Sequence, residues 1–254
     1  MIDTHAHLNV SQFDKDRKDI ILRCLANNIS IINIGIDYKS SCDAIEIAKE
    51  YNLYASIGLH PLDAPEEEFD YDAYKKLICD KVVAIGETGL DYWHKPKGKS
   101  KREAYKENQK RLFIKQIDLA YELDLPLIIH CRVAFDDMYD ILKTRKIKGV
   151  IHSFTGSVDD LEKFLFLGYY IGINGIIFKM DLKDVIEKIP MDRILLETDC
   201  PFLSPPSFEE RNNPMSLEIT AREIARIKNV SLEELIEKTN KNSLQLFNKM
   251  VYLF

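Results

Sequence analysis

The 254-residue chain lacks the features of secreted, membrane-spanning and multidomain proteins. No apolar run approaches the ~20 residues that a membrane span needs. The N-terminal stretch MIDTHAHLN carries charge where a signal peptide would be apolar, so we expect a cytoplasmic protein without a membrane segment. Repeats and Gly/Ser- or Pro-rich linkers are also lacking, and we therefore expect residues 1–254 to form a single domain.

Cysteine is scarce, and its arrangement excludes two classes of site. The five cysteines are odd in number and show no CxxC spacing: Cys24, Cys42, Cys79, Cys131 and Cys200. This argues against a disulfide framework and against a thiolate metal site. With 46% hydrophobic and 30% charged residues, the chain can bury a core without disulfides. Its net charge of −6 makes it a poor candidate for coating nucleic acid non-specifically.

What is present is a regular alternation of short β-branched runs and segments of helical period. The eight runs are Met1–Thr4, Ile31–Ile36, Tyr54–Ile57, Val82–Ile85, Leu127–Ile129, Val150–Ile151, Tyr170–Ile173 and Ile194–Leu196. Eight strands alternating with helices in about 250 residues predict an α/β fold, a parallel (β/α)8 TIM barrel. A doubly wound open sheet is the alternative, but neither GxGxxG nor GxxxxGK[ST] occurs.

Helices are expected between these runs. Residues 104–124 place apolar side chains at three- and four-residue intervals. Ser157 with Asp160, and Ser231 with Glu234, have the spacing of residues that begin a helix. Pro126 and Pro190 are expected to end helices before the next strand.

Polar residues interrupt the pattern where the expected strands end. In a barrel these ends form one rim, which is where active sites of this fold are built. They are Asp3, His5, His7, Glu87, His130, His152, Glu197 and Asp199. Strand residues two apart point the same way, so His5 and His7 should share a face, as should Glu197 and Asp199.

Each of these signals is ambiguous alone, because a single HxH or a lone strand-end histidine is more often a packing residue. Their conjunction is informative: five of the six histidines lie just past expected strands, namely His5, His7, His60, His130 and His152. Buried imidazoles and carboxylates at one rim need a cation between them. Mixed nitrogen and oxygen ligands suit Zn, Mn or Mg, and six ligands suit two ions better than one.

Seven stretches in order along the chain carry a family resemblance: IDTHAHL, SIGLHP, AIGETGLDY, LPLIIHCRVA, IHSFTGS, LLETDCPFLSP and RNNP. With them the chain resembles the TatD-type metal-dependent deoxyribonucleases of the amidohydrolase-like barrels. The resemblance implies a hydrolase with two divalent metal ions that acts on DNA, trimming single strands from a 3′ end as an exonuclease.

The resemblance also implies a role for each ligand. His5 and His7 would bind one metal with Glu87 and Asp199. Glu87 would bridge to a second metal held by His130 and His152. Asp199 would also be the catalytic proton acceptor for an attacking water. The chain departs from the family pattern at Leu62, where a second histidine is common, and at Cys131, where serine is common.

The expected chemistry follows from such a site. Two divalent ions lower the pKa of a bridging water, and the resulting hydroxide attacks the phosphorus of a phosphodiester. Glu197 either supports this site or pairs with an Arg or Lys inside the barrel.

Substrate contacts are less sharply defined. His60 and Arg211 are candidates for binding phosphate, Arg211 because its fork of donors suits phosphate oxygens. The basic stretch from His94 to Arg111 either guides a DNA strand or is a solvated surface, and Tyr92 with Trp93 either stack a base or pack under a loop.

Two other functions remain open. The same site could hydrolyse a carboxylic ester or amide, including the ester of an aminoacyl-tRNA. Superfamily amidases commonly bridge their metals with a carboxylated lysine, whereas Glu87 stands at this position. A non-catalytic scaffold that binds a partner is the third possibility, but it would be expected to have lost some of the six ligands. No obligate protein partner is inferred.

Overall fold

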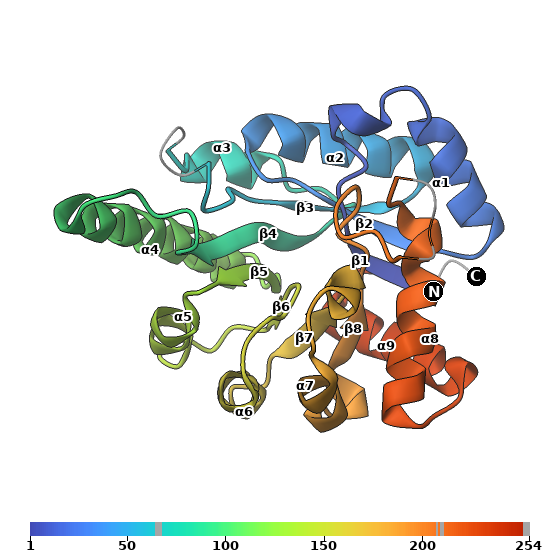
Figure 1. Cartoon of the computed structure of the whole chain (residues 1–254). Helices are drawn as coiled ribbons and strands as arrows, with labels where there is room; N and C mark the ends of the chain where they lie inside the picture. The colour runs from blue at the N-terminus through green and yellow to red at the C-terminus, as the bar shows by residue number, and fades with distance from the viewer. Residues whose placement is uncertain (64–67, 207, 209–210, 251–254) are drawn as a thin grey trace.

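The strands form a parallel barrel with helices on its outside (Figure 1). In this computed structural model, residues 1–63, 68–206, 208 and 211–250 are described. The strands are β1 (Ile2–Ala6), β2 (Ser30–Ile34), β3 (Tyr54–Ile57), β4 (Val82–Asp91), β5 (Leu127–Arg132), β6 (Gly149–Ile151), β7 (Tyr170–Ile173) and β8 (Ile194–Leu196). They are hydrogen-bonded in the order β1 to β8, every pair parallel, which confirms the predicted fold.

The barrel closes between the end of β1 and the segment after β8. Ala6 and Cys200 form an isolated parallel bridge there. The backbone N–H of His7 donates to the carbonyl of Cys200 at 2.9 Å, and that of Asp199 donates to the carbonyl of His5 at 2.8 Å. Residues almost 200 positions apart in the sequence thus become neighbours at the rim.

Helices follow the strands around the barrel. They are α1 (Arg17–Ala26), α2 (Tyr38–Tyr51), α3 (Tyr71–Lys76), α4 (Lys99–Glu122), α5 (Phe135–Leu142), α6 (Val158–Phe166), α7 (Lys183–Lys188), α8 (Leu217–Lys228) and α9 (Leu232–Leu246). Ser157 and Ser231 cap α6 and α9 as predicted. Among the described residues, no helix combines the length and the apolar character that crossing a bilayer requires.

The buried apolar side chains form two clusters. The larger packs helices against the outside of the strands and includes Cys131 and Cys200, so both cysteines pack in the core. The smaller joins residues of seven strands to Leu246 at the end of α9 and to Phe247 and Met250 after it. Because Ile2, Tyr54 and Val83 in this cluster stand at or next to the first residues of their strands, apolar side chains fill the end of the barrel where the strands begin. The opposite end is left for polar groups.

Strands β1, β4 and β5 extend further than the sequence pattern predicts. His5 lies within β1, Glu87 within β4 and His130 within β5, not after them. The reason is that a strand continues past its first inward polar residue when the neighbouring strands still pair with it. The register of β4 against β5 shifts between Ile85 and Thr88. Gly86 lies here with φ of 157°, and a Cβ on it would lie 2.6 Å from the carbonyl oxygen of Ile128. The glycine thus allows the strands to approach closely beside Glu87.

Candidate metal centre

Glu87 lies at the centre of the polar end of the barrel, and its side chain is almost completely buried. Five imidazoles surround its carboxylate within 3.8 Å. On Oε2 the distances are 3.4 Å to His5 Nε2 and 3.7 Å to His7 Nε2; on Oε1 they are 3.0 Å to His130 Nδ1, 3.4 Å to His60 Nε2 and 3.8 Å to His152 Nε2. One carboxylate on β4 therefore contacts histidines that come from β1, from β5 and from the segments after β1, β3 and β6.

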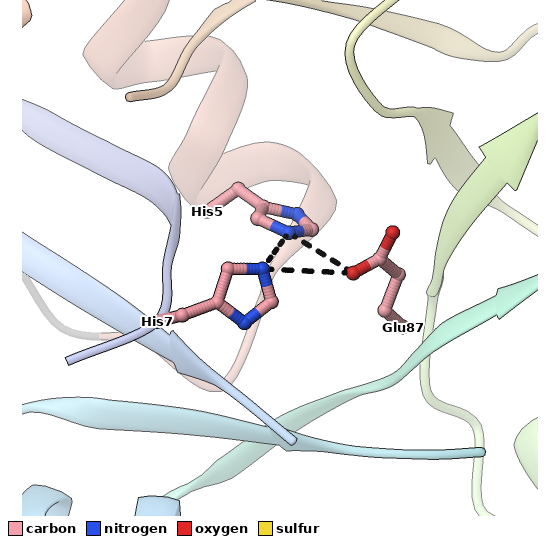
Figure 2. Close-up of side chains that lie close together, drawn as sticks. All are labelled: His5, His7 and Glu87. Carbon is pink, nitrogen blue, oxygen red and sulfur yellow. Dashed lines mark hydrogen bonds and ion pairs between the residues drawn. The ribbon is translucent and has the colours of Figure 1, made fainter. Parts of the chain in front are cut away.

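The first group of potential ligands comprises His5, His7 and Glu87 (Figure 2). Their ligand atoms lie within 4.8 Å of one another. The two Nε2 atoms face each other at 3.1 Å, since both side chains project from β1 and its continuation on the same side. Asp199 adds a carboxylate oxygen 3.4 Å from His7 and 3.8 Å from His5.

The second group comprises His60, Glu87 and His130, whose ligand atoms are also within 4.8 Å of one another. The sequence suggested His60 as a candidate for binding phosphate. In the structure its ring lies 4.5 Å from that of His130, centroid to centroid. The structure thus places His60 inside the cluster. Both groups share Glu87, so its carboxylate is positioned between two sets of imidazoles.

His152 lies deeper, with its ring stacked on that of His5 at a centroid distance of 3.5 Å. Its Nε2 is 3.9 Å from Asp199, and its Nδ1 is 2.9 Å from Glu197. Glu197 also accepts hydrogen bonds from the backbone of Ser153 and from Asn174. In the described part of the chain Glu197 has no Arg or Lys partner, so it orients His152 and does not form the alternative ion pair.

Glu197→Gln is therefore expected to weaken metal binding by about 10- to 100-fold, because the carboxylate that orients a potential ligand becomes a neutral amide. Metal titration followed by calorimetry measures this effect. Glu218→Gln, on the exposed face of α8, is the matched control. Unchanged affinity in Glu197→Gln would show that His152 needs no such support.

Two further aspartates hold the cluster, and the strand pattern alone does not reveal their roles. Asp91, buried at the end of β4, lies 3.2 Å from Nε2 of His130 and accepts the backbone N–H of Trp93 and His94. The carboxylate of Asp3, two residues before His5, accepts hydrogen bonds from the backbone N–H of His5 and from the backbone N–H and the hydroxyl of Thr198. Asp3 thereby ties β1 to the segment that carries Asp199.

The electrostatics of the cluster fit a bound cation. Burial alone would raise the pKa of Glu87, but His60, His5 and the hydrogen bond from His130 hold it well below its usual range. Burial would lower the pKa of His152, yet the carboxylates of Glu197 and Asp199 raise it to about 10. The carboxylates thus draw protons onto neighbouring imidazoles. A divalent cation would compensate the same buried negative charge, so the residues present fit a metal.

The cluster forms the floor of a pocket of about 840 Å³. Among the described residues that line it are His7, His60, Glu87, His130, His152 and Asp199. Arg211 is not one of them: its guanidinium donates to Asp16 at 2.8 and 2.9 Å and to the carbonyl of Gln12. Arg132 at the end of β5 does line the pocket and is a phosphate candidate that the sequence analysis missed.

The basic stretch is partly neutralised by its surroundings. Lys110 pairs with Asp137 at 2.9 Å, and Arg111 pairs with Glu68. Lys106 lies over the ring of Tyr92, which is buried and donates a hydrogen bond to Asp137. Tyr92 is therefore a packing residue, whereas Trp93 next to it is 62% exposed.

Comparisons with known proteins identify the family to which this chain is similar. The family model described as "TatD related DNase" matches residues 2–248. The chain is 40% identical to an "Uncharacterized metal-dependent hydrolase YabD" of Bacillus subtilis, over 97% of this chain and 98% of the relative. It is 31% identical to the human "Deoxyribonuclease TATDN3", over 100% and 96% of the two chains. The crystal structure of YJJV, a TatD homologue from Escherichia coli K12, superposes with a TM-score of 0.87 at 29% identity, covering 98% of each chain.

Proposed function

This chain belongs to the TatD related DNase family of metal-dependent hydrolases, and on that basis we propose that it hydrolyses phosphodiester bonds of DNA. Its preferred substrate would be a single strand shortened from the 3′ end. The observation that carries the proposal is the position of Glu87, shared by two groups of imidazoles at the floor of one pocket.

The same arrangement supports a site for two divalent ions. His5, His7, Glu87 and Asp199 would hold one ion, and Glu87, His130 and His152 the other. His60 is a further potential ligand of the second ion, because it lies in the group that contains His130. Zn, Mn and Mg all accept this mixed nitrogen and oxygen donor set. When bound, such ions lower the pKa of water and offset negative charge on a phosphodiester.

The residues of the chain would accept a proton and orient the rings of the potential ligands. Asp199 is held ionised because His152 and His7 outweigh the effect of its burial and lower its pKa, so its carboxylate can accept the proton of an attacking water. Glu87 would orient the imidazoles around it. Asp91 and Glu197 would fix the rings of His130 and His152 through the nitrogen that is not directed at the metals.

The proposal is tested with metal-stripped protein and single-stranded oligonucleotides labelled at the 3′ or the 5′ end. We expect no cleavage until Mg, Mn or Zn is restored, followed by immediate loss of the 3′ label and progressive shortening of the 5′-labelled strand. If the protein binds about two metal ions and leaves DNA intact, the proposal that DNA is its substrate is refuted. Hydrolysis of aminoacyl esters by that protein would instead identify a carboxylic ester hydrolase.

We also propose that residues 1–254 form one domain. Strands from the beginning and end of the chain pair at the rim, and α9 packs against the apolar end of the barrel, so neither half is complete alone. Urea unfolding followed by circular dichroism and by the fluorescence of Trp93 should therefore give one coincident transition. Two separated transitions would contradict the single domain.

A further inference from the structure

Exposed apolar side chains gather around the mouth of the pocket. Of the nine large hydrophobic side chains that are exposed in the described residues, five line this one cavity: Leu62, Trp93, Val133, Met180 and Phe202. Such clustering of apolar surface marks a place where another molecule binds. Because the polar cluster lies at the floor of the same pocket, that molecule would be the substrate.

The two aromatic rings of this rim stand on opposite sides of the barrel. Trp93 follows β4, and Phe202 follows β8. In a barrel whose eight strands are ordered β1 to β8, these strands are four places apart and so face each other across the axis. The imidazoles and carboxylates therefore lie between the two rings.

Each ring is anchored to a residue that touches the cluster. The backbone N–H of Trp93 donates to Asp91 at 2.9 Å, and Asp91 contacts His130. The backbone N–H of Phe202 donates to the carbonyl of Asp199 at 3.0 Å, and its ring centroid lies 6.2 Å from that of His7. The backbone that carries each ring is thus positioned relative to the cluster, whereas the side chains extend into solvent, with Trp93 62% and Phe202 53% exposed.

A cationic side chain lies against the ring of Trp93. The guanidinium of Arg132 lies over the indole of Trp93, 5.1 Å from its centroid. Within the described ranges no carboxylate forms an ion pair with Arg132, in contrast to Arg211, which is held by Asp16. A guanidinium without an acidic partner beside an exposed indole suits a nucleotide, with phosphate on the donors and a base against the ring.

We propose that Trp93 with Arg132 on one side of the rim, and Phe202 on the other, form a two-sided clamp for the unpaired nucleotides that flank the scissile phosphodiester. This rests on the proposed function and adds the basis of its strand preference. Bases can stack on protein rings only when they are not stacked within a duplex, so the clamp selects single strands. Each nucleotide would be held by its base, and the phosphodiester between them would lie over the cluster.

The chain contains a single tryptophan, so the fluorescence of the protein reports directly on one side of the clamp. A single-stranded phosphorothioate oligonucleotide, added to the full chain with Mg²⁺, is expected to quench Trp93. The matching duplex, and an abasic strand of the same length and charge, are expected to leave the fluorescence nearly unchanged. Equal quenching by all three would overturn the clamp.

Kinetics of variants provide the second readout. Trp93→Ala and Phe202→Ala are each expected to raise KM for single-stranded DNA by about tenfold or more. The rise in KM should be much smaller for an abasic strand of the same length, which offers no base to either ring. Tyr121→Ala and Phe166→Ala, which remove exposed rings outside the pocket lining, are the matched controls and should leave both substrates unaffected.

The outcomes separate the clamp from the function on which it rests. If the wild-type chain cleaves single-stranded DNA but both variants keep its KM, the clamp is wrong and the proposed function stands. If the wild-type chain leaves DNA intact with every metal, the proposed function fails and the clamp with it. A change of oligomeric state in the variants, with KM unaltered, would identify the rim as a contact between copies of the chain and would also overturn the clamp.

Discussion

Replacing Asp199 by Asn is expected to lower kcat for DNA by about a thousandfold. The carboxylate of Asp199 lies 3.4 Å from His7 and 3.9 Å from His152, where it can both contact a metal and accept a proton. Asparagine keeps the size of the side chain, but its neutral amide cannot accept the proton and is a weaker metal ligand than a carboxylate. It also tolerates the backbone at this position, where φ is 54°, better than alanine would. The loss should therefore be chemical and not structural.

Steady-state kinetics with single-stranded DNA measure this effect, and circular dichroism checks the fold. Asp136→Asn is the matched control, because Asp136 lies on the exposed surface of α5 and contacts only Lys163 among the described residues. We expect the control to keep full activity. A kcat for Asp199→Asn within tenfold of the wild type would rule out Asp199 as the proton acceptor.

Glu87→Gln is expected to have the largest effect on metal binding. Among the residues that the structure describes, the carboxylate of Glu87 is the one group that contacts all five imidazoles of the cluster, at distances from 3.0 to 3.8 Å. An amide in its place has the same shape but only one acceptor oxygen and no charge. Since even outer partners of metal ligands contribute 10- to 100-fold to affinity, loss of a shared carboxylate should cost more than about 100-fold.

The experiment measures metal content after dialysis, together with the rise in melting temperature on adding Mn²⁺ or Zn²⁺. The wild-type chain should melt at a higher temperature when metal is present, because an ion that binds only the folded state stabilises it. Glu87→Gln should lose this shift, whereas Glu68→Gln, which replaces a surface partner of Arg111, should retain it. If Glu87→Gln retains two bound ions per chain, Glu87 is not the shared ligand.

Much of the fold was predictable because local periodicity reflects burial. Each of the eight predicted runs overlaps a strand, since apolar β-branched residues on parallel strands are covered on both faces. The predicted ends of these strands were less accurate. The apolar run that predicts β4 ends at Ile85, because Gly86 and Glu87 interrupt it, although pairing with β5 extends β4 to Asp91.

Which residue types stand at the rim can be deduced from local sequence alone, because alternation along a strand is a local property. His5 and His7 are two residues apart, and their shared direction can be deduced without any knowledge of the barrel. The same holds for Glu197 and Asp199. The number of histidines just past predicted strands then indicated a site for cations.

Which of these groups touch one another, and which are already engaged elsewhere, depends on how the chain folds in three dimensions. His60 lies within the cluster and Arg211 is held by Asp16, 195 positions away in the sequence. Likewise, Trp93 and Phe202 face each other across the pocket only because β4 and β8 lie on opposite sides of the closed barrel. Such distances depend on strand order, register and closure, which bring together residues far apart in the chain, and no local pattern encodes them.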